Sequence, residues 1–384
     1  MRSIFLIRVS NLLLSVLALK IILSFPEENN LRFLLQATAI AGMLSVLELG
    51  AGDYILQKIS NNRFQFEKSI IWLGFALLML AVLLANAALL FLFDSDFATY
   101  ISGFFIVFSS ALLVYYSIVI KLSYVISFFR KLIVAFSGFS ILFLLFLFLI
   151  NKYDWLDYSE LLMVIYGYQC FFGVVCFSAL LRTKMFVLEG FSYFGGIWKF
   201  ALDGIFNPLA IGFLFFSITL MQHREDVVDY SVLMRLTGIA AMFIFIEIMK
   251  IWQGNKLFLA NKVLKRCMVL AVVGVLSLWL TSEIWWKFLG ASERGMSWQM
   301  ALLLLLFVFS RVGQDIAGQF YKKINKENIA MLLSVISLVI ILCVCLFLKQ
   351  DADYGVWLIP AYSFIMFLLS FLFIYRSLII KNEK

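Results

Sequence analysis

The feature that most constrains this chain is a series of twelve apolar stretches, each long enough to cross a lipid bilayer. Backbone polar groups in lipid must pair within their own segment, and the stretches lack the alternation of β-strands, so each predicts a transmembrane helix. Mean hydropathy is +1.01, and 64% of the 384 residues are hydrophobic. We therefore expect an all-α, multi-pass integral membrane protein. The predicted spans are 4–25, 33–57, 69–93, 97–120, 132–150, 159–181, 197–221, 228–252, 267–288, 298–317, 328–348 and 355–379.

The charged residues of the loops predict the orientation of these spans. The two terminal segments and the even-numbered loops hold 21 Lys and Arg residues against four acidic residues, whereas the odd-numbered loops hold six basic and fourteen acidic residues. Cytoplasmic loops carry the excess of Lys and Arg, so both termini are expected in the cytoplasm. The net charge of +8 then reflects topology and attraction to membrane lipids, and nucleic acid is not an expected partner. Residues 121–131 are either a loop or a helical extension.

An internal repeat is indicated by residues 34–48, which resemble residues 233–247 at an offset of 199. Glu48 and Glu247 match across this offset, as do Thr38 and Thr237. The two copies are six spans apart and therefore cross the membrane in the same direction. This predicts two six-helix bundles, 1–190 and 191–384, related by an axis along the membrane normal, with the substrate between them near the midplane.

Nine charged residues remain inside the predicted spans, where each would cost a few kcal/mol if it faced lipid. Two interpretations stay open for most of them: structural pairing within the protein, or exposure to a wet cavity. The i,i+4 spacing of Lys199 with Asp203, and of Arg311 with Asp315, permits structural pairs. Asp53 is near a span end and can pair with a loop base, and Lys20 can extend to the interface. The nine residues are Lys20, Glu48, Asp53, Lys199, Asp203, Arg235, Glu247, Arg311 and Asp315.

The functional interpretation of these charges is a cationic cavity with associated acids. Arg235 has no acid one helical turn away, so an inward-facing role is favoured for it and for Glu48. Arg and Lys donors match phosphate and pyrophosphate, and buried carboxylates can take up a coupling H⁺ or Na⁺. The predicted anion-binding residues are Lys20, Lys199, Arg235 and Arg311, and the predicted ion-coupling residues are Glu48, Asp53, Asp203 and Glu247.

Helix-breaking residues indicate candidate hinges. Gly50 and Gly52 loosen the second span beside Glu48 and Asp53, and Pro208 should kink the seventh span. An ordinary packing kink is the alternative.

No motif for catalysis, a cofactor or a metal site is recognised in the sequence. The only histidine, His223, falls in an odd-numbered loop, the five cysteines fall in or beside spans, and no Gly-rich phosphate loop is found. We expect no catalytic residue, no cofactor and no bound metal, and therefore not an enzyme.

Residues 47–60 (LELGAGDYILQKIS) resemble the end of the second helix of Wzx-type O-antigen flippases, and residues 230–236 (YSVLMRL) resemble the opening of their eighth helix. These flippases belong to the multidrug/oligosaccharidyl-lipid/polysaccharide exporter superfamily. The chain departs from the family's pattern because residues 246–252 lack the usual proline.

The resemblance implies a monomer in the bacterial inner membrane. It would move undecaprenyl-diphosphate-linked oligosaccharide from the cytoplasmic to the periplasmic leaflet, with a polysaccharide polymerase and chain-length proteins as partners. A cation-coupled drug antiporter of the same superfamily is the alternative. A third hypothesis, an intramembrane enzyme acting on lipid-linked sugars, lacks a catalytic acid or His at an outer interface.

Overall fold

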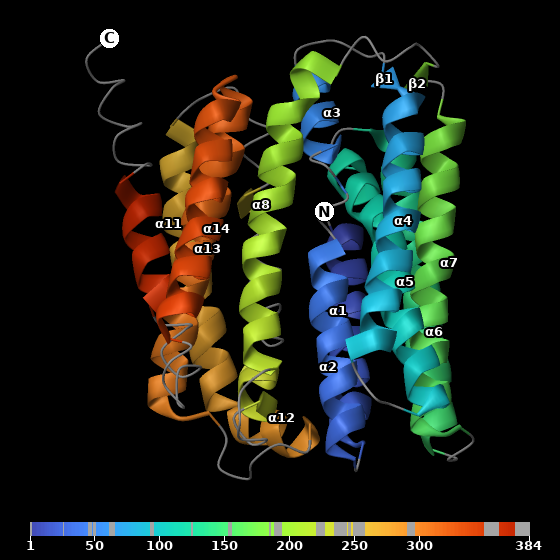
Figure 1. Cartoon of the computed structure of the whole chain (residues 1–384). Helices are drawn as coiled ribbons and strands as arrows, with labels where there is room; N and C mark the ends of the chain where they lie inside the picture. Colours follow the sequence, from blue (N-terminus) through green and yellow to red (C-terminus); the bar gives the residue numbers. More distant parts are fainter. Residues whose placement is uncertain are drawn as a thin grey trace. The chain divides into compact units, whose positions relative to one another are not determined.

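The described part of the chain is almost entirely helical (Figure 1). A computed structural model describes residues 2–25, 27–44, 48, 51–60, 66–92, 96–123, 126–152, 156–183, 186–187, 194–219, 227–233, 244, 247–248, 258–289, 296–348 and 361–372. The chain divides into two compact units, Met1–Gly212 and Phe213–Lys384. The prediction of an all-α membrane protein is confirmed, while the number of twelve spans and the side of the termini stay predictions.

The first unit is a bundle of long helices. Its helices are α1 (Arg2–Leu23), α2 (Glu28–Met43), α3 (Ala51–Ser60), α4 (Lys68–Leu92), α5 (Phe97–Ser123), α6 (Ser127–Lys152), α7 (Tyr158–Arg182) and most of α8 (Phe194–Thr219). A parallel pair of two-residue strands, β1 (Phe66–Glu67) and β2 (Phe186–Val187), joins the segments before α4 and after α7. Among the described helices, α5 and α7 pack together most extensively, and a Cβ on Gly173 would lie 2.7 Å from the carbonyl oxygen of Leu112. Such small residues let membrane helices approach closely.

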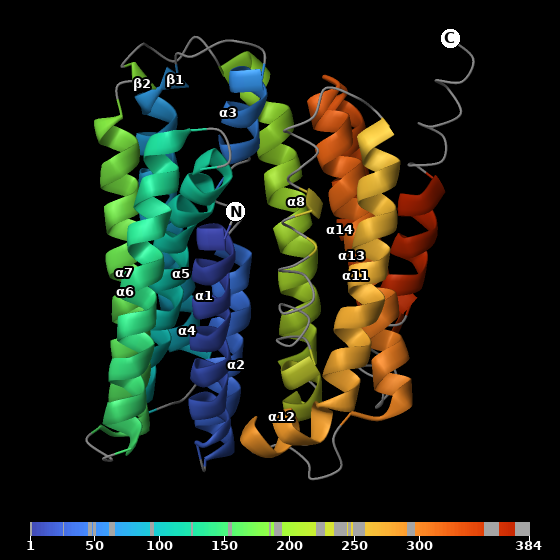
Figure 2. The ribbon, with the colours of Figure 1, turned by 180° about the vertical axis from the view of Figure 1, so that it is seen from behind.

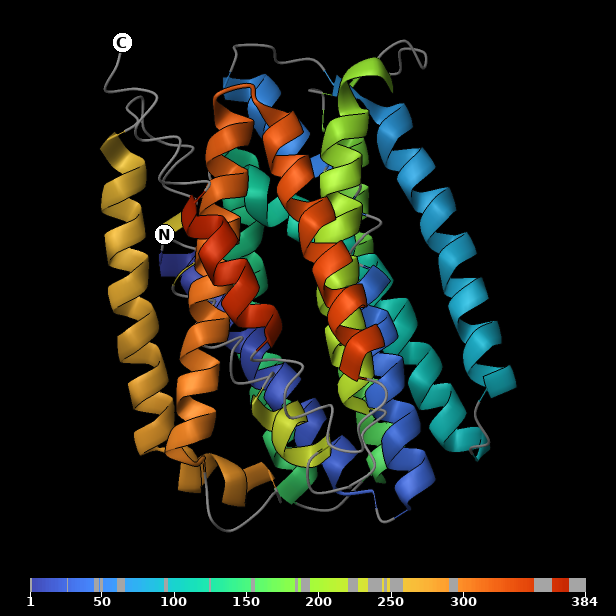
Figure 3. The same ribbon diagram turned by 60° about the vertical axis from the view of Figure 1, so that its left-hand side comes forward.

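The second unit is built around α13 (Trp298–Lys323), which packs against α11 (Phe258–Leu280) and α14 (Glu327–Leu348). Two further helical segments belong to it, residues 227–233 and Ala361–Leu372. The short helix α12 (Ser282–Leu289) lies across the end of α11 in the views of Figures 2 and 3.

Seven helices of the described part are long and apolar enough to cross a membrane. Their outward flanks carry large apolar side chains that are mostly exposed, such as Phe91 on α4 at 84% and Phe148 on α6 at 68%. Surfaces of this kind suit lipid. The qualifying segments are Gly74–Phe91, Phe97–Ser123, Ser127–Ile150, Tyr158–Arg182, Val263–Leu280, Trp298–Lys323 and Glu327–Val344.

Two predicted spans are broken in the structure, and one uncertain segment is resolved. The predicted helix 33–57 is wrong as a single helix, because α2 ends at Met43 and α3 begins at Ala51. The predicted helix 267–288 is also interrupted, by a turn at Thr281. Residues 121–131 are mostly helical extension, because α5 runs to Ser123 and α6 starts at Ser127.

Candidate functional site

Two carboxylates converge on one lysine in the first unit. The Lys121 ammonium on α5 lies 2.6 Å from Glu48 Oε1 and 3.0 Å from Asp53 Oδ1. The Ser117 hydroxyl, one turn before Lys121, donates to Glu48 Oε2 at 3.0 Å. The exposed fraction of each charged side chain is 13% for Lys121 and Glu48 and 6% for Asp53. We call Glu48, Asp53, Ser117 and Lys121 the acid–lysine cluster. With both acids ionised, its formal charge is −1.

The break between α2 and α3 makes this cluster possible. Glu48 lies in the break and Asp53 lies in the first turn of α3, so the two acids approach α5 from either side of Gly52. A Cβ on Gly52 would lie 2.6 Å from Glu48 Oε1 and 2.8 Å from Lys121 Cδ. Gly52, predicted as a hinge, is therefore also needed for the close approach of the acid and the lysine. Lys121 directly follows the predicted span 97–120 and is therefore one of the loop bases, not a predicted site residue. Both of its acidic partners come from outside α5, so no local spacing in the sequence indicates this pairing.

The α8 helix adds two more predicted site residues to the first unit. Phe200 on α8 packs edge-on against Tyr54 on α3, with ring centroids 5.6 Å apart, and both rings are buried. Lys199 and Asp203 flank Phe200, and Asp203 is also buried. The Tyr54–Phe200 contact therefore places the part of α8 that contains Lys199 and Asp203 beside α3.

Lys20 is separate in sequence and lies in the last turn of α1, where it is partly exposed. The helix ends there, and the Ser24 backbone N–H and the Ser24 hydroxyl both donate to the Lys20 carbonyl, at 3.1 and 2.8 Å. This end position fits a side chain that extends toward an interface.

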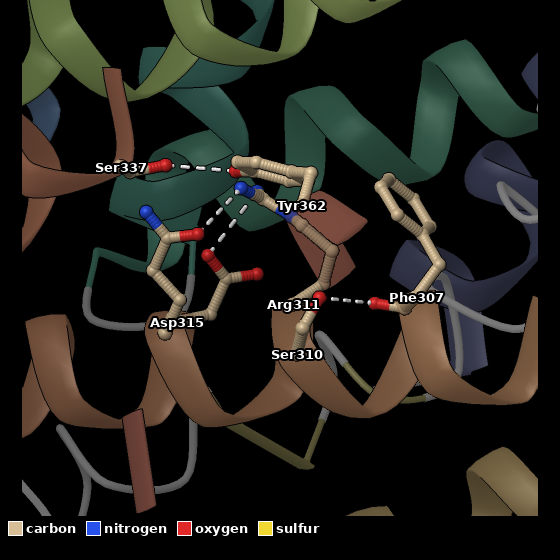
Figure 4. A network of polar contacts seen from close by, with 7 residues as sticks. Phe307, Ser310, Arg311, Asp315, Ser337 and Tyr362 are labelled. Atoms are coloured by element: carbon tan, nitrogen blue, oxygen red, sulfur yellow. Dashed lines mark hydrogen bonds and ion pairs between the residues drawn. The ribbon is translucent and has the colours of Figure 1, made fainter. Parts of the chain in front are cut away.

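A second polar group, centred on Arg311, lies in the second unit (Figure 4). Arg311 is thirteen residues after the start of α13 and twelve before its end, which is about 18–20 Å from either end at 1.5 Å per residue. Arg311 thus lies near the middle of α13. Its Nη1 donates to Gln314 Oε1 and its Nη2 to Asp315 Oδ1, both at 3.3 Å. The Arg311 side chain is 22% exposed.

Two hydroxyl groups from neighbouring helices lie near this arginine. The hydroxyls of Ser337 on α14 and Tyr362 share a hydrogen bond of 2.7 Å, with both residues fully buried. Figure 4 shows the Tyr362 phenol beside the Arg311 guanidinium. Gly313 lets α13 and the Ala361–Leu372 helix, which contains Tyr362, pack closely, because a Cβ at Gly313 would lie 2.8 Å from Ser370 Cβ. The name Arg311 network is used for Arg311, Gln314, Asp315, Ser337 and Tyr362.

Glu247, the predicted repeat partner of Glu48, also faces a base within its own unit. Its Oε2 lies 3.7 Å from Arg266 Nη1 on α11, a longer contact than that of Glu48, and the arginine is half exposed. Each of the two matched glutamates therefore has a basic neighbour.

Three predicted residues are described incompletely or not at all. Arg235 and Gly50 lie outside the described residues. Pro208 lies inside α8, which is helical on both sides of it. Within the described part of the chain, no group of three His, Cys, Asp or Glu side chains is placed to hold a metal ion.

Comparison with known proteins identifies the fold. No protein-family profile matches the chain, and no curated protein sequence matches it. Solved structures do match over nearly the whole length. The chain resembles a mutant of the Vibrio cholerae MATE transporter VcmN with a TM-score of 0.63 at 13% identity, covering 98% of this chain and 94% of that one.

Two further structures extend the comparison to the MOP superfamily. A multidrug resistance MATE family transporter in an outward-facing conformation matches with a TM-score of 0.63 at 12% identity, over 100% of this chain and 95% of that one. A Pyrococcus furiosus MOP superfamily transporter, described as having a binding pocket of reverse polarity, matches at 0.61 and 15% identity, over 96% and 93%. The chain thus has the fold of MATE transporters of the MOP superfamily.

Proposed function

We propose that this protein is a flippase for an anionic lipid-linked substrate, namely undecaprenyl-diphosphate-linked oligosaccharide, in the bacterial inner membrane. The observation that carries the proposal is the depth of Arg311, a base in the middle of α13 with its side chain partly exposed. A charge at this depth is costly against lipid and typically faces a wet pathway or a partner. A guanidinium binds two oxygens of a phosphate at once, which suits the pyrophosphate of such a lipid.

The neighbouring Asp315 does not prevent the Arg311 guanidinium from binding phosphate oxygens. The Arg311–Asp315 contact is 3.3 Å, longer than the 2.7–2.9 Å typical of strong charge-assisted hydrogen bonds. A substrate pyrophosphate has more charge and more oxygens than one carboxylate, so it competes well for the guanidinium. The residues 47–60 and 230–236, which resemble Wzx-type flippases, support the same substrate class. The predicted bases Lys20, Lys199 and Arg235 would extend the cationic surface.

The acid–lysine cluster supplies a candidate for energy coupling. Both carboxylates, Glu48 and Asp53, contact Lys121, so uptake of a proton or Na⁺ by either acid would weaken its hold on the lysine during transport. Asp203 and Glu247 are further candidates. A polysaccharide polymerase and chain-length proteins would act on the product after translocation.

The test uses a strain that lacks the gene and measures surface polysaccharide together with the amount of protein in the membrane. Arg311→Ala should abolish polysaccharide display, and Arg311→Lys should retain part of it because a point charge still attracts phosphate. Arg182→Ala, at the exposed end of α7, is the matched control and should be silent.

The double variant Arg311→Ala/Asp315→Asn separates transport from structure. It removes both charges, so no carboxylate remains opposite the missing guanidinium. If Arg311 only balances Asp315, the double variant should display polysaccharide normally. If Arg311 binds substrate, the double variant should be as inactive as Arg311→Ala at normal abundance. Normal display by the double variant would therefore contradict the role of Arg311.

A cation-coupled drug antiporter is the second candidate, favoured by the net negative charge of the acid–lysine cluster. One of the matching structures is named as a multidrug resistance transporter. Expression in a drug-sensitive strain distinguishes the two functions. Resistance to cationic dyes that is lost in Glu48→Gln, with polysaccharide display unaffected by gene deletion, would favour the antiporter.

A further inference from the structure

The short helix α12 (Ser282–Leu289) has three distinct faces. Ser282, Trp286 and Leu289 are buried against the protein, at 4%, 0% and 1% exposure. At about 100° per residue, these three side chains fall within one sector of about 60°. Glu283 and Lys287 form a second, exposed and charged sector.

The third sector of α12 is apolar and exposed. Ile284 is 70% exposed and Phe288 is 43% exposed, and the two lie about 40° apart on the helix. A helix at a protein surface in water needs two faces, one buried and one polar. A third face that is apolar and uncovered is typical of a helix at a lipid–water interface, with one side in contact with the apolar boundary.

The helix that precedes α12 also has an exposed apolar stripe. Val269, Val273, Leu276 and Leu280 recur every three or four residues, and their exposed fractions are 62%, 54%, 48% and 77%. This stripe belongs to Val263–Leu280, one of the helices apolar and long enough to span a membrane. Because α12 starts two residues after Leu280 and lies across the end of α11 (Figure 3), it follows directly on the end of the span.

Two tryptophans fix α12 in this position. The indole N–H of Trp286 donates to Asp229 Oδ1 at 2.9 Å, which ties α12 to the helical residues 227–233. The indole N–H of Trp285 donates to the Thr281 hydroxyl at 3.1 Å, across the turn between α11 and α12. Tryptophan is enriched at membrane interfaces because it has an apolar ring and a polar N–H.

We infer that α12 is an interfacial helix that lies in the phospholipid headgroup layer. Ile284 and Phe288 insert toward the acyl chains, while Glu283 and Lys287 face water. The Trp286–Asp229 hydrogen bond holds the helix against residues 227–233. The occupant of the uncovered apolar face is the bilayer itself. A change in the position of the 227–233 segment would then be resisted by the lipid contacts of α12.

The experiment measures the accessibility of nitroxide spin labels in the full-length protein in phosphatidylethanolamine–phosphatidylglycerol vesicles. Single cysteines are introduced as Ile284→Cys, Phe288→Cys, Glu283→Cys and Lys287→Cys, after the five native cysteines are replaced. Val273→Cys on the α11 stripe is the lipid reference, and Lys326→Cys, which is exposed, is the water reference. Power saturation with oxygen reports contact with lipid, and saturation with a nickel chelate reports contact with water.

Labels at positions 284 and 288 should favour oxygen, less strongly than the label at 273, and labels at 283 and 287 should favour the nickel chelate. Four labels that all behave like the one at 326 would place α12 in water, and four that behave like the one at 273 would place it in the bilayer core. Either result overturns the inference. Trp286→Phe should increase the mobility of the label at 284, since it removes the donor to Asp229. Unchanged mobility would show that this hydrogen bond does not hold α12 against residues 227–233.

Discussion

The Lys121 ammonium lies 2.6 Å from one carboxylate oxygen of Glu48 and 3.0 Å from one of Asp53, so a single base on α5 contacts an acid within the α2–α3 break and another in the first turn of α3. The acid–lysine cluster thus connects the break to one of the best-packed helices of the first unit.

Lys121→Met should lower the thermal stability and the membrane abundance of the protein, because it removes the ammonium that both Glu48 and Asp53 contact. Removal of one partner of a buried ion pair costs about 3–5 kcal/mol. The measurement is the melting temperature of detergent-solubilised protein, with Lys131→Met, on the exposed surface of α6, as the control. A triple variant that also contains Glu48→Gln and Asp53→Asn should recover much of the loss. Equal melting of Lys121→Met and the control would contradict the arrangement of the cluster.

Gly52→Ala should be destabilising even though alanine favours helix. A Cβ at this position would lie 2.6 Å from Glu48 Oε1 and 2.8 Å from Lys121 Cδ, so the ion pair must move. We expect a loss of about 1–3 kcal/mol, the usual cost of overpacking. Gly42→Ala in α2 is the matched control, since its Cβ would meet no atom within 4 Å, and it should be neutral or stabilising by up to about 1 kcal/mol. The prediction fails if the two variants melt at the same temperature.

The Ser337–Tyr362 hydrogen bond should give a measurable coupling energy. Tyr362→Phe keeps the ring and removes the hydroxyl, which leaves the buried Ser337 without this 2.7 Å partner. Double-mutant cycles between membrane helices give about 0.6 kcal/mol on average and at most about 1.7 kcal/mol. Unfolding measurements on Tyr362→Phe, Ser337→Ala and the double variant should give a coupling in this range. Strictly additive effects would show that the bond does not stabilise the unit.

Hydropathy was sufficient to predict most helices but not their interruptions. The predicted span 97–120 corresponds to α5, and the predicted span 159–181 corresponds to α7, with ends that differ by up to three residues. Apolar content reports whether a segment suits lipid. It contains little information on whether the helix continues, and so the turn at Thr281 and the α2–α3 break were not predicted.

The charged sites show a related limit of the sequence. Lys121 was counted as a loop base because lysine is costly inside a span, but this cost disappears when acids surround the ammonium. Such pairing depends on which helices are neighbours, which the sequence alone does not show. Arg311 and Asp315 were predictable as a pair because both lie on α13 at i,i+4 spacing.

The topology of the chain gives the last prediction. Reporter fusions after Asn30, Asp96, Asp154, Asp226 and Asp351 should all report the periplasm, because 21 of the 27 loop bases fall on the other side. Two contacts within the first unit support the same side for three of these loops. Asn30 Nδ2 lies 3.4 Å from Asp96 Oδ2, and the Phe25 and Tyr158 rings lie 5.9 Å apart.

These contacts bring the first, third and fifth loops to one end of the bundle. Fusions within residues 61–65 and 184–185, which flank the β1–β2 pair at the other end, are the controls and should report the cytoplasm. Alkaline phosphatase and green fluorescent protein give opposite signals on the two sides, so every position is tested twice. A cytoplasmic signal at any two of the five acidic-side positions would contradict the twelve-span topology.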